Sequence, residues 1–266
     1  MNLILGLFIF LFGASIGSFL NVLIDRLPQE RKITGRSVCD YCQHQLAWYD
    51  LIPIFSFFLL KGHCRYCRKK ISFQYPLVEI LTGLMFIFVF LTYVKNIQEI
   101  SLWQKWLVIL SLWGIISCFI VIFFSDAKYH LISDYILWAL FGFSFFLKLF
   151  YQSTEIMKQV ENDIFSSLIV AFPIWLIYFL SKEKAMGLGD VYLAAILGFL
   201  LGWQKGFLAL YLAFVLGGIT GFFLILFGRK KLKSKIAFGP FLVIGALVMF
   251  FLGEGILQWV MRIYGL

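Results

Sequence analysis

The stretch LILGLFIFLFGASIGSFLNVLI, residues 3–24, contains no charged side chain and is long enough to cross a bilayer as a helix. Similar apolar runs recur along the rest of the 266-residue chain, of which 62% is hydrophobic and only 14% is charged. A soluble domain would be about half apolar and about a quarter charged. The composition therefore predicts an all-α membrane protein whose apolar surface faces lipid.

The apolar runs predict about eight transmembrane helices. They lie near residues 3–24, 76–94, 103–124, 131–150, 164–181, 187–203, 206–227 and 238–260. The run at 187–203 gives the weakest signal. The first run is too long, and has too few basic residues before it, for a cleaved secretion signal, so we interpret it as the first spanning helix.

The basic residues predict the orientation, because Lys and Arg are retained on the cytoplasmic side. The segments after the first, third, fifth and seventh runs, which include 25–75 and 229–235, hold 17 of the 23 Lys and Arg residues. Both termini are therefore expected to face outward, with 25–75 in the cytoplasm. The net charge of +9 reflects this asymmetry and an attraction to anionic membrane lipids, and it does not indicate nucleic-acid binding.

Two Cys-x-x-Cys pairs, Cys39/Cys42 and Cys64/Cys67, stand in the polar segment 25–75. Two facing knuckles of this kind supply four thiolates in the tetrahedral arrangement that zinc prefers, and they leave no open position for catalysis. Disulfides are the alternative, and a reducing cytoplasm disfavours them. The spacing predicts a structural zinc site that stabilises a domain too small to fold on its own core.

The segment between the pairs, WYDLIPIFSFFLL (48–60), is too short to span a bilayer. It is expected to lie against the lipid headgroups or the underside of the helix bundle. A buried hairpin inside the zinc domain is the alternative, and the sequence does not separate the two.

Four acidic residues fall within or beside the apolar runs, all at the predicted cytoplasmic ends: Glu79, Asp126, Asp134 and Asp190. Asp126 ends a helix, where the helix dipole disfavours an acid, so its alternative role is that of an interfacial residue screened by Lys128. Asp134 follows Ser133 in a good helix-start pattern. Glu79 is a possible supporting residue, with one buried contact to a lysine or an amide as the alternative.

Asp190 belongs to the stretch Gly187-Leu188-Gly189-Asp190. If Trp203 marks the outer interface, a full-length helix reaches back to about residue 184 and places Asp190 ~9 Å inside the hydrocarbon edge. A simple first-turn acid is the alternative. An ionisable residue at such depth indicates a functional site. Gly187 and Gly189 let the backbone bend or let another chain approach closely. Two such acids from different helices, sharing one proton, resemble the pair of an aspartic protease.

Five motifs occur in the order typical of the prepilin peptidases, which cut the leaders of type IV pilins and pseudopilins, and the sequence resembles that family nearly end to end. They are GASIGSFLNVLIDRLP (13–28), the Cys pairs flanking DLIPIFSFF (50–58), YPLVEILTG (75–83), Asp126 followed by Ile132-Ser133-Asp134, and the Gly187–Asp190 motif. One departure is Ser133, where the family often has proline.

The resemblance implies that Asp126 and Asp190 are the catalytic aspartates and that the protein lies in the bacterial cytoplasmic membrane. It also implies precursor substrates with short basic leaders, cut after a glycine at the cytoplasmic face. Many members then methylate the new N-terminus with S-adenosylmethionine, although the sequence contains no glycine-rich nucleotide loop of the soluble methyltransferase kind. Gly187 and Gly189 would give the substrate backbone room.

The domain division expected from these patterns is a first helix at 1–24, a zinc domain at 25–75 and a peptidase domain at 76–266. Two other functions remain as alternatives: a proton-coupled transporter, and a membrane methyltransferase without protease activity. Transporters commonly carry internal repeats and charges at mid-membrane. This sequence has no evident repeat, and its acids gather at one predicted face.

Overall fold

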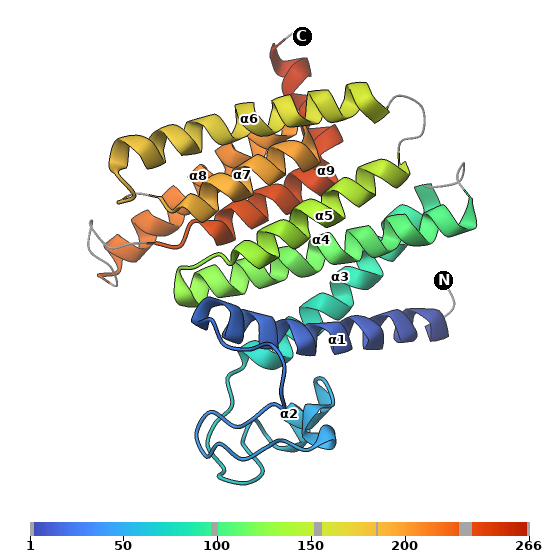
Figure 1. The fold of residues 1–266 in the computed structure, drawn as a ribbon, viewed down its shortest axis with the longest axis vertical. Helices are drawn as coiled ribbons and strands as arrows, with labels where there is room; N and C mark the ends of the chain where they lie inside the picture. Colours follow the sequence, from blue (N-terminus) through green and yellow to red (C-terminus); the bar gives the residue numbers. More distant parts are fainter. Residues whose placement is uncertain (1–2, 97–100, 152–155, 185, 229–235, 265–266) are drawn as a thin grey trace. The chain divides into compact units, whose positions relative to one another are not determined.

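The computed structural model describes residues 3–96, 101–151, 156–184, 186–228 and 236–264 and is all-helical there. These residues form eight long helices at the eight predicted positions: α1 (Leu3–Arg26), α3 (Gln74–Asn96), α4 (Leu102–Tyr129), α5 (Asp134–Tyr151), α6 (Ile156–Ser181), α7 (Leu188–Leu201), α8 (Trp203–Leu226) and α9 (Gly239–Tyr264) (Figure 1). Three short helical pieces, η1 (Leu27–Gln29), η2 (Trp48–Leu51) and α2 (Phe55–Leu59), lie between α1 and α3. The basic segment 229–235, which was predicted to face the cytoplasm, lies outside the described residues.

Among the described residues, six helices are long and apolar enough to cross a membrane by themselves. They are the eight long helices without α5 and α7. The shorter α7 is apolar but has only 14 residues. The prediction of an all-α membrane protein is therefore confirmed, with six to seven helices of membrane type.

The chain divides into two compact units within α4, between Val121 and Ile122. In the first unit, α1 and α3 pack closely through small residues. A Cβ at Gly13 would lie 2.8 Å from the Cα of Gly83, and one at Gly17 would lie 2.7 Å from the Cα of Glu79. Small residues spaced by four let membrane helices approach closely. This close contact explains why the GASIGSF stretch contains glycines. The loops at 27–73 connect the ends of these two packed helices (Figure 1).

In the second unit, α7 packs against four helices, α5, α6, α8 and α9. Most of its residues from Val191 to Leu200 are buried. Contacts between backbones are close here too, because a Cβ at Gly198 would lie 2.6 Å from the carbonyl oxygen of Ser166 in α6. Enclosure by protein explains how a helix of this length is accommodated in a membrane protein, since its ends need not reach both interfaces.

Candidate functional site

Asp126 lies in the last turn of α4 and is buried. The helix ends because His130 adopts a left-handed conformation with φ of 54°, while its N–H donates to the Asp126 carbonyl at 2.9 Å. The Asp126 carboxylate has a backbone partner from another helix. Its Oδ2 accepts the backbone N–H of Gly239 at 2.8 Å. This contact offsets the unfavourable placement of an acid at a helix C-terminus.

Gly239 is the first residue of α9, so the N–H that reaches Asp126 belongs to a helix N-terminus. Such groups carry partial positive charge and have no partner within their own helix. A Cβ at Gly239 would lie 2.7 Å from Asp126 Oδ2 and 3.1 Å from its Cγ, so only glycine fits. Sequence reasoning missed this residue. The signal was the Gly239-Pro240 pair at the start of the last apolar run, a typical helix start.

Asp190 is the third residue of α7, and its Oδ2 accepts the N–H of Gly187 at 3.2 Å. The expectation of a helix reaching back to about residue 184 is wrong. The chain turns after Ser181 through positive φ angles at Lys182 and Glu183, and α7 begins only at Leu188. In its local geometry, Asp190 is therefore an acid in the first turn of a helix, as the alternative interpretation of the sequence had it.

The two aspartates nevertheless come together. The Asp126 and Asp190 carboxylates are close enough to interact electrostatically. The start of α7 meets the connection between α4 and α5, because a Cβ at Gly189 would lie 3.1 Å from the Cβ of Ile132. Gly187 is different: a Cβ there would have 3.8 Å to its nearest neighbour, the Asp190 carboxylate. Gly189 thus allows close packing within the chain, whereas Gly187 is exposed and a Cβ there would make only ordinary van der Waals contacts.

The other two acids have different surroundings. Asp134 is the first residue of α5 and is exposed, as its helix-start pattern indicated. Glu79 belongs to the first unit, where it is buried near the start of α3. Its Oε2 accepts the N–H of Ile54 at 2.6 Å. This matches the buried contact to an amide that was one of its two predicted roles.

The four cysteines of the first unit form one cluster, with all four sulfur atoms within 4.8 Å of one another. The two pairs have the same backbone geometry. In the first pair, the N–H of Cys39 donates to the carbonyl of His44, and the N–H of Gln43 donates to the carbonyl of Cys39. In the second pair, the N–H of Cys64 donates to the carbonyl of Lys69, and the N–H of Arg68 donates to the carbonyl of Cys64. Gln43 and Arg68 both have positive φ. Two matched knuckles thus present their thiols to a common centre.

The sulfur geometry fits a tetrahedral metal. Zinc–sulfur bonds of about 2.3 Å imply sulfur–sulfur distances of about 3.8 Å, and Cys39 Sγ and Cys67 Sγ lie 3.8 Å apart. Burial raises the pKa of the Cys39 thiol, but hydrogen bonds from the amides of Cys42 and Tyr41 and from neighbouring thiols lower it to about 7. The Lys69 amide lowers the pKa of Cys67, but burial and hydrogen bonds with the other three sulfurs raise it to about 11. All four thiols can lose their protons together only when a cation balances the charge.

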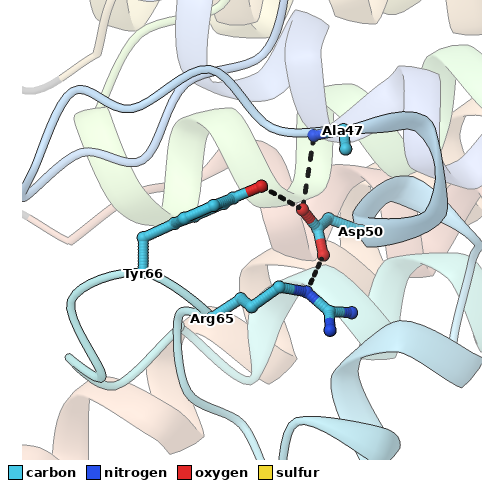
Figure 2. Close-up of polar contacts among 4 residues, drawn as sticks. All are labelled: Ala47, Asp50, Arg65 and Tyr66. Carbon is cyan, nitrogen blue, oxygen red and sulfur yellow. Dashed lines mark hydrogen bonds and ion pairs between the residues drawn. The ribbon is translucent and has the colours of Figure 1, made fainter.

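An acid with a buried side chain joins η2 to the second knuckle, and sequence reasoning missed it. Asp50 Oδ1 accepts the Nε–H of Arg65 at 2.7 Å, and its Oδ2 accepts the Ala47 N–H at 3.3 Å and the Tyr66 hydroxyl at 3.4 Å. Figure 2 shows these partners around the carboxylate. Ala47 precedes η2, whereas Arg65 and Tyr66 stand between the cysteines of the second knuckle. The signal was the single acid inside the apolar segment 48–60.

The fold and these sites define a class: a multi-pass helical membrane protein with two interacting carboxylates at helix ends and a separate four-cysteine cluster. Two family models match the chain. One, described as the bacterial peptidase A24 N-terminal domain, matches residues 11–93, and the other, the type IV leader peptidase family, matches residues 113–222. The first range contains the four cysteines and the second contains Asp126 and Asp190.

Curated relatives named prepilin leader peptidase/N-methyltransferase match over most of the chain. The relative from Aeromonas salmonicida (strain A449) is 30% identical over 94% of this chain and 92% of its own. The Pseudomonas aeruginosa relative is 26% identical over 96% and 93%, and that from Klebsiella pneumoniae is 34% identical over 75% and 86%. No solved structure matches. The chain belongs to the type IV leader peptidase family, and the family resemblance is confirmed.

Proposed function

We propose that this protein is a membrane-embedded aspartic endopeptidase in which Asp126 and Asp190 form the catalytic pair. Its substrates are prepilin or pseudopilin precursors, whose short basic leader it removes after a glycine. The family match and the names of the relatives support the reaction class. The observation that carries the residue assignment is that two carboxylates from different helices, near enough to influence each other electrostatically, each accept one backbone N–H at a helix start.

The chemistry needs both acids, because two neighbouring carboxylates cannot both ionise readily and therefore share one proton. The ionised carboxylate accepts a proton from water, whose oxygen then bonds to the scissile carbonyl carbon. The protonated carboxylate donates a hydrogen bond to the carbonyl oxygen. When the C–N bond breaks, the leaving amine takes up a proton from the pair. The N–H groups of Gly239 and Gly187 hold the two carboxylates in place through these steps.

Gly187 gives the substrate backbone room beside Asp190, since Gly187 is exposed and its Cβ position is crowded by none of the described residues. Gly189 acts indirectly, by allowing the α7 start to pack on Ile132. Asp134 and Glu79 are supporting residues only. Asp134 starts α5, and Glu79 connects α3 to the loop at Ile54.

The membrane setting follows from the charge asymmetry. The protein lies in the bacterial cytoplasmic membrane with both termini outward and the aspartates near the cytoplasmic face. A precursor with an apolar helix in the bilayer and a basic leader in the cytoplasm would then offer its cleavage site at the depth of the two acids. Residues 1–24 form the first helix, 25–75 the cytoplasmic zinc domain and 76–266 the peptidase domain.

The four-cysteine cluster holds a structural zinc ion through Cys39, Cys42, Cys64 and Cys67, because four thiolates at tetrahedral spacing leave no position for substrate. A second activity follows cleavage: the new N-terminal amine is methylated with S-adenosylmethionine as methyl donor. The names of the relatives support methylation, and the identity of the donor rests on the family resemblance.

The test is cleavage of a synthetic leader-bearing precursor by the purified protein, read by mass spectrometry. Asp126→Asn and Asp190→Asn should each lower the cleavage rate by about 10³-fold or more, because each removes one of the two proton-transfer groups. Asp134→Asn is the matched control and should retain most activity. Near-normal cleavage by either of the first two variants, with bound metal and normal membrane insertion, would remove the assignment. With S-adenosylmethionine present, the mature product should gain one methyl group.

A further inference from the structure

A stripe of large apolar side chains faces outward from the loops of the first unit. It consists of Trp48, Leu51, Ile52, Phe55, Phe58 and Leu59, all of which are exposed. The side chain of Trp48 is 78% exposed and that of Leu59 is 65% exposed. Trp48 and Leu51 belong to η2, Ile52 follows it, and Phe55, Phe58 and Leu59 belong to α2. We call this set the apolar stripe.

The outward direction of the apolar stripe is a specific feature of the fold, because a neighbouring aromatic residue points inward. Phe57 contacts Gly62, whose Cβ position lies 3.1 Å from the Phe57 ring, and its ring centroid is 6.0 Å from that of Phe73. Phe57 is thus half-buried, whereas Phe58, whose ring centroid lies 5.8 Å from that of Phe57, stays exposed with the rest of the stripe. Large exposed apolar side chains gathered in one short segment mark an interaction site.

The apolar stripe is anchored to the end of a membrane-length helix. The Ile54 N–H, in the middle of the stripe segment, donates to the buried Glu79 carboxylate of α3 at 2.6 Å. Ile54 has φ of 66° and ψ of −53°, and the Phe55 N–H donates to the Pro53 carbonyl at 2.5 Å, which together form a γ-turn. Glu79 lies about 8 Å along α3 from its first residue, so the stripe is held where this helix meets the membrane boundary.

The charge of the surrounding loops identifies the chemistry of the partner. Residues 25–75, all of which the structure describes, carry eight exposed basic residues against two exposed acidic ones, Glu30 and Asp40. The basic ones are Arg31, Lys32, Arg36, Lys61, Arg65, Arg68, Lys69 and Lys70. Clusters of this size beside a spanning helix bind anionic lipid headgroups, whereas they repel a basic peptide. Aromatic side chains beside basic ones are also typical of residues at a membrane interface.

We propose that the apolar stripe inserts into the anionic headgroup layer next to α3, so that the zinc domain lies on the membrane surface instead of extending into water. Glu79, through Ile54, fixes the depth at which the stripe meets the lipid. This inference concerns residues outside the aspartate pair, and it stands whether or not the peptidase assignment holds.

The test places the photocrosslinker p-benzoylphenylalanine at Phe58, or at Tyr41 as a matched control in the first knuckle, outside the stripe. The full-length protein is reconstituted into nanodiscs of phosphatidylcholine alone or with about 30% phosphatidylglycerol, irradiated and digested for mass spectrometry. Position 58 should give lipid adducts several times more often than position 41. Phosphatidylglycerol should increase the yield at 58, and high salt should reduce that increase.

Bound metal measured on each labelled protein shows that the domain is folded, and p-benzoylphenylalanine at Phe55 provides a second stripe position. Crosslinks from position 58 mainly to other segments of the chain, or to a second copy, would overturn the proposal. Equal lipid adducts at positions 58 and 41 would do the same, because contact would then not be specific to the stripe. A yield at 58 that is indifferent to phosphatidylglycerol would remove the anionic lipid as the partner.

Discussion

The aspartate pair and the cysteine cluster are assembled in opposite ways. The aspartates come from α4 and α7, and backbone N–H groups at helix starts hold them, one donated by Gly239 from a point 113 residues away in the sequence. The cysteines come from two similar tight turns with few helical residues, and their knuckles are built from local hydrogen bonds. Helix packing therefore positions one site, whereas local turns form the other, which we propose a metal stabilises. Substitutions should therefore be most damaging at the glycines beside the two acids and, in the cluster, at the cysteines themselves.

The largest effect is expected at the cysteine cluster, where one ligand is indispensable. Cys39→Ser should reduce bound zinc from about one ion per chain to a small fraction of that, because three remaining thiolates hold the metal far less tightly. The loops of residues 27–73 should then become sensitive to limited proteolysis. Metal analysis of freshly purified, reduced protein measures the first effect, and peptide mapping the second.

Cys118 provides the control, because it is a buried thiol within α4 and does not belong to the cluster. Cys118→Ala should leave the metal content unchanged. If Cys39→Ser kept its metal, or if the unaltered protein contained none, the zinc assignment would be abandoned.

The next effect is expected at the helix start that holds Asp126. Gly239→Ala should lower the rate of leader cleavage by about 100-fold, because the new Cβ would lie 2.7 Å from the carboxylate oxygen and displace it. Bound metal should not change. Gly218→Ala in α8 is the matched control, since a Cβ there meets nothing within 4 Å. Equal activity of the two variants would mean that the Gly239 contact does not position the acid.

The two glycines of the Gly187–Asp190 motif should separate packing from substrate access. Gly189→Ala should lower the stability of the detergent-solubilised protein by about 1 kcal/mol, because its Cβ would crowd Ile132. Gly187→Ala should leave stability unchanged and raise the KM for the precursor by about tenfold, since its Cβ enters the open space beside Asp190. Thermal unfolding and steady-state kinetics measure the two effects. A Gly187→Ala variant with normal KM would contradict its role in substrate access.

The same contrast explains what the sequence could predict. The eight helices and the cysteine cluster were found because apolar run length and Cys-x-x-Cys spacing are local signals. The apolar run at 187–203 located α7 well, but the length argument that extended it back to residue 184 was wrong, because it treated that helix as if it alone had to cross the bilayer, whereas four helices enclose it. The partner of Asp126 could not be inferred, because Gly239 approaches it only when α4 and α9 pack. The sequence did predict that Asp126 and Asp190 lie near each other, but not which backbone N–H groups hold their carboxylates.

The smallest effect is expected where Asp50 joins η2 to the second knuckle. Asp50→Asn should make chelator-induced loss of metal about two- to fivefold faster, because it removes the charge that pairs with Arg65, an interaction that solvent weakens. An asparagine keeps an oxygen that can accept the Ala47 N–H, so the domain should still fold (Figure 2). Asp40→Asn, an exposed acid in the first knuckle, alters the net charge equally and should have no such effect. If both variants released metal at the same faster rate, the net charge of the loops would be responsible, and the contacts of Asp50 with the second knuckle would not be what retains the metal.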